Sequence, residues 1–187
     1  MKNLCAALLL AFSSPMAHAD DVSEALAAAT TAYGAGDLNG TAAQITAASR
    51  AVLALQTERL AGYLPEAPTG WAREIDASAA EGMTLMGMTG NMVQARYTDP
   101  QGNSFSLTLT ADSPLVAQMA GILGNPQMMA MMGKVVKVAG QDMLEQDGSL
   151  SALVGGRVLV QAQGMESDAM QGVLGAVDFT RLAAYDS

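Results

Sequence analysis

Apolar and polar residues alternate along the C-terminal half of the chain, a pattern typical of β-strands. In residues 157–163, Val158, Val160 and Ala162 fall on one face, whereas Gln161 and Gln163 fall on the other. Turn residues separate this run from three earlier strand-like runs, at 134–138, 142–146 and 149–154. We expect the four runs to form an antiparallel meander with one apolar and one polar face.

A second pair of strand-like runs lies upstream, at residues 92–98 and 104–111. In the latter run, Phe105, Leu107 and Leu109 alternate with Ser106 and Thr108. The intervening residues 99–103 contain proline and glycine and predict a turn. This hairpin would extend the meander to a mostly antiparallel sheet of about six strands. The run at 82–90, rich in glycine and methionine, fits neither a strand nor a helix.

Helical periodicity replaces alternation in the N-terminal third. The first predicted helix carries apolar residues at helical spacing: Val22, Leu26, Ala29 and Tyr33. The second, at 41–62, carries its larger apolar residues broadly on one side: Ile45, Val52, Leu55 and Leu60. Glycines at 34, 36 and 40 interrupt the periodicity, so the two helices are expected to form an antiparallel hairpin.

Further helical segments occur among the strands. Ser113 and Pro114 are typical of a helix start, and the apolar residues up to 123 follow the spacing of a buried stripe. Residues 127–132 predict another short helix, and residues 167–177 predict an amphipathic helix that covers the meander. Strands segregated from helices define an α+β fold, with the helices expected on one face of the sheet.

The N-terminus has the pattern of a secretory signal peptide. Lys2 precedes an apolar run at 4–12, and Ala17 and Ala19 flank the cleavage position. We expect cleavage after Ala19 and export to the bacterial periplasm. The apolar run is shorter than the roughly 20 residues that span a bilayer, and no later segment is longer, so we expect no membrane span in the mature chain.

The predicted domain organisation follows from these boundaries. A signal peptide at 1–19 precedes a helical hairpin at 20–63, a linker at 64–71 and an α+β domain at 72–187. The linker sequence LPEAPTGW contains two prolines and favours an extended connector. We expect Trp71, the only tryptophan, to pin the hairpin to the sheet.

Charge and composition exclude several functions. Cleavage would remove the only cysteine, Cys5, and the only histidine, His18. The formal net charge of −9 repels phosphate backbones and anionic lipids, which argues against nucleic-acid and electrostatic membrane binding. Zinc lacks its usual ligands in the mature chain. We therefore expect no cofactor.

Catalytic chemistry has few candidate residues. The mature chain lacks a histidine base, a cysteine nucleophile and a G-x-S-x-G motif, and only Lys134 and Lys137 could serve as lysine bases. Five acids could form carboxylate pairs: Glu74, Asp76, Asp142, Glu145 and Asp147. Charged residues on the solvent face of a sheet explain these acids equally well, so we expect no enzymatic activity.

Methionine is the unusual component. Eight of the fourteen methionines form two clusters: Met83, Met86, Met88 and Met92, then Met128, Met129, Met131 and Met132. Methionine fills irregular gaps in cores and forms adaptable apolar surfaces, which is the interpretation we prefer. Thioethers also suit Cu(I). The candidate copper ligands would share a strand face or a helix face: Met86, Met88 and Met92, or Met128, Met131 and Met132.

Two segments resemble known families. Residues 32–38, AYGAGDL, with Ala42 and Ala43 behind them, resemble the turn of a tetratricopeptide hairpin. A single such repeat cannot bury its own face, which implies packing on the rest of the protein or on a partner. The strand and turn order from Phe105 onward, closing with VDFTRL at 177–182, resembles Mog1/PsbP-like modules and uncharacterised domains of bacterial envelope proteins. That resemblance implies a binding or scaffolding module without chemistry of its own.

These observations predict an exported, non-catalytic binding or interaction module of the bacterial periplasm. A protein partner or a hydrophobic ligand is expected to occupy its binding surface. The alternative is a methionine-dependent protein that binds or chaperones Cu(I).

Overall fold

A computed structural model describes residues 16–76 and 90–185 of the chain. The chain divides into two compact units, Met1–Leu55 and Gln56–Ser187, and the division falls inside the second helix. Within the described ranges, the structure contains no helix with the length and apolarity that a membrane crossing requires.

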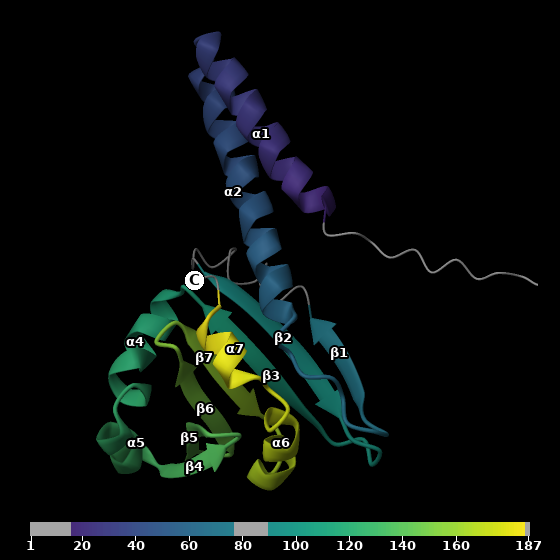
Figure 1. Cartoon of the computed structure of the whole chain (residues 1–187), viewed down its shortest axis with the longest axis vertical. Coiled ribbons are helices and arrows are strands. Elements are labelled where there is room, and N and C mark those ends of the chain that lie inside the picture. The colour runs from purple at the N-terminus through teal and green to yellow at the C-terminus, as the bar shows by residue number, and fades with distance from the viewer. Residues whose placement is uncertain (1–15, 77–89, 186–187) are drawn as a thin grey trace, which may run out of the picture. The chain divides into compact units, whose positions relative to one another are not determined.

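The chain begins with the expected hairpin of two packed antiparallel helices, α1 (Met16–Gly34) and α2 (Leu38–Ala61), and the first unit contains α1 and the part of α2 up to Leu55 (Figure 1). Asp37 caps α2, because its Oδ1 accepts a hydrogen bond of 2.9 Å from the Gly40 amide. Small residues are the most buried in the hairpin: Ala25, Ala29 and Ala48. Most of the larger residues of the two predicted apolar stripes are exposed or partly exposed, although Leu60, in the second unit, is fully buried.

The second unit is built on one seven-stranded sheet. Its strands are β1 (Ala72–Asp76), β2 (Asn91–Thr98), β3 (Ser104–Ala111), β4 (Lys134–Val138), β5 (Gln141–Gln146), β6 (Ser149–Val154) and β7 (Val158–Gln163). The spatial order is β1-β2-β3-β7-β6-β5-β4, and every neighbouring pair is antiparallel. The α+β fold is confirmed, with seven strands rather than about six because 72–76 pairs with β2.

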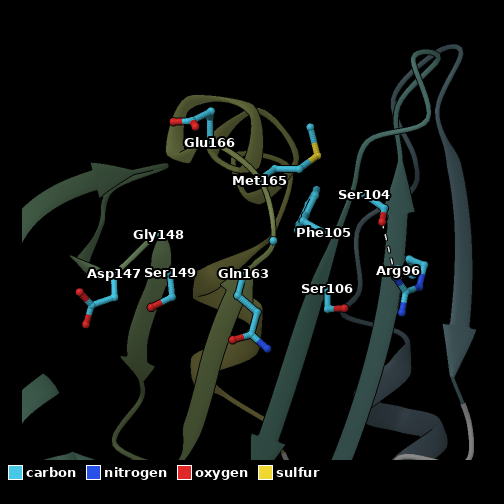
Figure 2. Close-up of a pocket in the computed structure, with 11 residues that line it drawn as sticks. Arg96, Ser104, Phe105, Ser106, Asp147, Gly148, Ser149, Gln163, Met165 and Glu166 are labelled. Carbon is cyan, nitrogen blue, oxygen red and sulfur yellow. Dashed lines mark hydrogen bonds between the residues drawn. The ribbon is translucent and has the colours of Figure 1, made fainter.

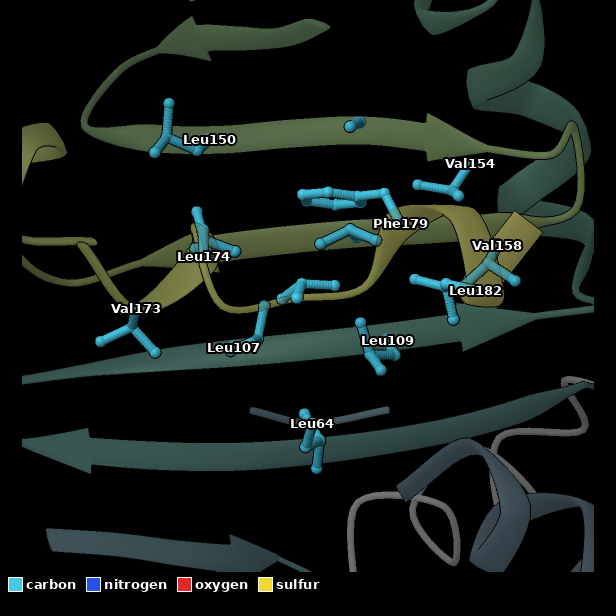
Figure 3. Packing of buried hydrophobic residues seen from close by; sticks show 14 of the residues in the cluster. Leu64, Leu107, Leu109, Leu150, Val154, Val158, Val173, Leu174, Phe179 and Leu182 are labelled. Atoms are coloured by element: carbon cyan, nitrogen blue, oxygen red, sulfur yellow. The ribbon is translucent and has the colours of Figure 1, made fainter. Parts of the chain in front are cut away.

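Two helices cover one face of the sheet, α6 (Ser167–Leu174) and α7 (Phe179–Ala183). Leu107 and Leu109 of β3 face Leu174 and Leu182 across this main core (Figure 3). The predicted alternation holds here, since Val158, Val160 and Ala162 of β7 are buried in the same cluster. Gly155, in the turn between β6 and β7, has φ +59°, and a Cβ there would lie 2.6 Å from the Ala183 carbonyl oxygen. This close approach of α7 explains a glycine in that turn.

Two other helices cover part of the opposite face, α4 (Pro114–Leu123) and α5 (Pro126–Met132). Ser113 caps α4 as expected, accepting a 3.1 Å hydrogen bond from the Leu115 amide. A second apolar cluster joins these helices to the sheet: Val116, Leu123, Met129, Leu144 and Leu159. Helices therefore lie on both faces of the sheet rather than on one. The face of β7 that was predicted to be polar is apolar where Leu159 joins this cluster and polar in the rest of the strand.

The connector between α2 and β1 is fixed to the sheet by aromatic and polar contacts. The Tyr97 hydroxyl donates a 2.6 Å hydrogen bond to the Pro65 carbonyl oxygen, and Arg73 Nη1 donates to the same oxygen at 3.0 Å. Phe105 stacks on Tyr97, with ring centroids 5.2 Å apart, and meets Trp71 edge-on at 6.3 Å. Trp71 thus packs the connector onto β3.

The buried phenol of Tyr97 makes the folding stability depend on pH in the alkaline range. Burial raises the pKa of Tyr97 from 10.0 to about 12, although the nearby Arg73 opposes the shift. The unfolded chain releases this proton near pH 10 and the folded chain does so near pH 12. Rising pH therefore favours unfolding in this window, by up to about 2–3 kcal/mol.

We predict that Tyr97→Phe removes this alkaline loss of stability. At neutral pH the variant should be destabilised by about 1 kcal/mol, because one buried hydrogen bond is lost. Urea unfolding between pH 7 and 12 measures both effects. Tyr33→Phe, at an exposed hairpin position, is the control. Parallel pH profiles for the wild type and Tyr97→Phe would show that the phenol is not the responsible group.

Candidate functional site

The short helix α5 presents three of the predicted candidate methionines to solvent. Asn125 caps the helix, since its Oδ1 accepts a 2.9 Å hydrogen bond from the Gln127 amide. Gly133 ends the helix next to β5, where a Cβ would lie 2.5 Å from the Glu145 carbonyl oxygen. The chain therefore turns directly from α5 into β4.

Packing decides which methionine of α5 is buried. Met129 is 2% exposed and lies in the cluster with Leu144. The other three methionines of the helix, Met128, Met131 and Met132, have i, i+3 and i+4 spacing, and Met131 is 80% exposed. The exposed fractions of these three side chains make them available for contact with a partner or ligand.

The apolar surface continues onto β4. Val135 pairs with Leu144, so its side chain lies on the same face of the sheet as the α4 and α5 cluster, and it is exposed. We call the set Met128, Met131, Met132 and Val135 the methionine surface. It is made of flexible thioethers and one branched residue, a composition suited to adaptable apolar contacts.

The methionine surface borders an edge of the sheet. β4 is the last strand in the sheet order, so among the described residues no strand pairs with the outer side of its backbone. Lys134 bonds Glu145 at 3.1 Å, and Lys137 bonds Asp142 at 2.8 Å. These ion pairs hold the two lysines against β5.

The other candidate methionines do not join this surface. Met92 lies on β2, five strand positions from β4, a separation of about 24 Å at the usual strand spacing. Met83, Met86 and Met88 fall outside the described residues. Met92 and the methionines of α5 therefore do not lie in one site.

The five candidate carboxylates do not converge, because Asp147 lines a cavity described below whereas the other four lie on β1 and β5. Glu74 and Asp76 are exposed on the edge strand β1 and pair in register with Arg96 and Gln94. Asp142 and Glu145 lie three residues apart on β5, hence on opposite faces, and each bonds a lysine of β4. Among the described residues, no three His, Cys, Asp or Glu side chains form a group that could hold a metal ion.

A shallow cavity that the sequence did not predict lies at one end of the sheet. It has a volume of about 740 Å³ and is lined by residues of β2, β3, β6 and β7 and by the segment that leads from β7 into α6 (Figure 2). Strand pairing places four side chains in one row across β2, β3, β7 and β6: Arg96, Ser106, Gln163 and Ser149. The row spans about 14 Å, because neighbouring strands are about 4.8 Å apart.

The cavity is suited to hydrogen bonding. Arg96 lies at one end, where its Nη1 donates to the Ser104 hydroxyl at 3.4 Å. Asp147 and Glu166 contribute carboxylates at the other end, and neutral polar groups lie between (Figure 2). Alternation in 104–108 and 161–163 indicated a polar face, but the row itself depends on the pairing of β3 with β7.

No protein-family model matches the chain, and neither a curated protein nor a solved structure shows significant similarity to it. The resemblances to Mog1/PsbP-like modules and to a tetratricopeptide hairpin therefore stay predictions.

The different burial of Met129 and Met131 gives a stability test of the site. Met129→Ala should lower the free energy of unfolding by about 2–4 kcal/mol, because it leaves a cavity against Leu144. Met131→Ala should change it by less than about 0.5 kcal/mol. Urea denaturation of both variants measures the difference. Equal losses would mean that the helix is rotated relative to the sheet.

Proposed function

We propose that the protein is an exported, non-catalytic binding module of the bacterial periplasm that binds a protein partner through the methionine surface. The observation that carries this proposal is the exposure of Met128, Met131 and Met132 beside the edge strand β4. Soluble proteins place most of their large apolar side chains inside, so an exposed cluster of this kind favours a contact surface.

The geometry favours an extended segment of the partner. An added strand can hydrogen-bond to the uncovered backbone of β4, while alternate side chains reach Val135 and the methionines. Thioether side chains adapt to differently shaped apolar groups, which suits recognition of a flexible peptide segment. The lysines of β4 are held by Asp142 and Glu145, so the apolar contacts carry most of the interaction.

Site-specific photo-crosslinking in the source cells tests this proposal. A photo-reactive amino acid at Met131 should give discrete adducts with an exported protein. The same group at Gln101, exposed in the turn between β2 and β3, is the matched control and should give none. Val135→Lys, added to the Met131 probe, should reduce the adducts at least about tenfold, because it places a charge in the apolar contact.

Three results would contradict the proposal. Adducts of equal intensity from Met131 and Gln101 would indicate random encounters. Adducts unaffected by Val135→Lys would place the contact elsewhere. Recovery of the chain from the cytoplasm with residues 1–19 still attached would contradict the proposed export.

Cu(I) binding is a second candidate function, favoured by the same exposed thioethers. Met128, Met131 and Met132 lie at i, i+3 and i+4 on α5, so their sulfurs can approach one ion from one side of the helix. Three thioethers are a soft ligand set that selects Cu(I) over harder divalent ions.

Anaerobic Cu(I) titration of residues 20–187 against a chromogenic chelator tests this candidate. If the site exists, one equivalent should bind, and Met128→Leu/Met131→Leu/Met132→Leu should abolish binding while retaining apolar character. The control changes three other methionines of the described chain: Met92→Leu/Met119→Leu/Met165→Leu. No binding by the wild type, or equal loss in both triple variants, would rule out this site.

A further inference from the structure

The helical hairpin has an inverted arrangement of large and small apolar residues. Its most buried side chains are alanines, Ala25 and Ala29 on α1 and Ala48 on α2. Larger apolar side chains are exposed: Leu26, Tyr33, Leu38, Ile45 and Val52. Leu38 and Tyr33 are each 68% exposed and Ile45 is 52% exposed, values unusual for the apolar stripe of a globular helix.

Five of the six exposed large apolar residues in the described part of the two helices are spaced by heptads, and the sixth, Leu53, adjoins Val52. Leu26 and Tyr33 are seven residues apart on α1, and Leu38, Ile45 and Val52 follow the same interval on α2. Ala42 and Ser49 fall between the α2 residues and complete an alternating spacing of four and three. This is the a/d pattern by which helices pack against other helices in coiled coils and bundles.

Both stripes lie on one side of the hairpin. At about 100° per residue, Leu26 and Tyr33 are offset from the alanines of α1 by about 60–80° in the direction of the chain. The α2 stripe is offset from Ala48 by about 40–80° in the same sense. Because the helices run in opposite directions, equal offsets turn the two stripes to the same side. Together they form one apolar face, which we call the hairpin face.

Charge makes the hairpin face suitable for self-association. The whole chain has a formal net charge of −9, so two copies repel each other at most surfaces. Between Leu26 and Ser49 the only charged residue is Asp37, which lies in the turn as the cap of α2. Two hairpin faces can therefore meet without opposing like charges along the helices.

We propose that two copies of this chain associate through their hairpin faces to form a four-helix bundle. Leu26, Ile45 and Val52 of each copy then pack between the helices of the other, and the alanine seams remain inside each hairpin. The bundle buries the apolar face that a two-helix hairpin leaves open. This proposal concerns the first compact unit and is independent of the methionine surface, which belongs to the second.

The size of the face predicts a reversible dimer. Leu38 to Val52 spans about 21 Å of helix and the two helices are about 20 Å wide, so the face has a projected area on the order of 400 Å². Two such faces would bury on the order of 800 Å² in total, which is below the range of stable interfaces and within that of weak, transient contacts. We therefore expect the mass to change with protein concentration rather than stay fixed at that of a dimer.

Sedimentation equilibrium of the protein purified after expression of the full chain tests the proposal. The mass should rise from one chain to two as concentration increases, and the melting temperature should rise with it. Leu26→Lys/Ile45→Lys should remain monomeric at every concentration. Thr31→Lys/Ala47→Lys, which adds the same charge at exposed positions on the other side of the hairpin, should dimerise like the wild type.

A second pair, Leu26→Gln/Ile45→Gln, guards against unfolding of the lysine variant, because glutamine removes the apolar side chains without adding charge and keeps the same helix propensity as lysine. Both pairs should keep the wild-type helical circular dichroism signal. A wild type that stays monomeric at the highest soluble concentration would overturn the proposal. So would a dimer that persists in the glutamine pair, or a dimer that is lost equally in Thr31→Lys/Ala47→Lys.

Discussion

The pairing of β3 with β7 is the contact on which the second unit depends. It aligns Leu107 with Ala162 and Leu109 with Val160, and it joins the upstream hairpin to the C-terminal meander. A slip of one residue would turn every side chain of β3 to the other face. Ser106 and Thr108 would then replace leucines opposite α6 and α7, so the main core specifies this register.

The same register creates the row of polar side chains in the cavity. Ser106 lies opposite Gln163 only because Leu107 lies opposite Ala162, and Gln163 in turn meets Ser149 of β6. Hydrophobic burial on one face thus positions hydrogen-bonding groups on the other. Substitutions in the core that shift β3 relative to β7 would disturb the cavity as well, although no core residue has to touch a ligand.

Local signals predicted the strands and helices, but non-local pairing had to come from the structure. Turn residues and alternation identified β2 to β7, because these signals act over a few residues. The join between β3 and β7 was not predictable, since either hairpin could add to either edge. β1 has no alternating pattern of its own and becomes a strand through its pairing with β2. The helical face of α5 was predicted, whereas the burial of Met129 depends on Leu144 in a distant strand.

Side-chain size, rather than hydrophobicity alone, explains which residues of the helical hairpin are buried. The sequence showed the stripe that contains Leu26 and Tyr33, yet the most buried side chains of α1 are those of Ala25 and Ala29. Alanines let two helix backbones approach closely, and they lose no rotamer entropy when they are buried. A helix pair can therefore pack through alanines alone. The large apolar residues do not take part in that contact and stay exposed. Exposed apolar side chains lower the solubility of a protein, and they bring no benefit unless something binds to them. These residues have heptad spacing on both helices, and no charged residue occupies a position of either stripe. A second helical surface that covers them best explains this pattern.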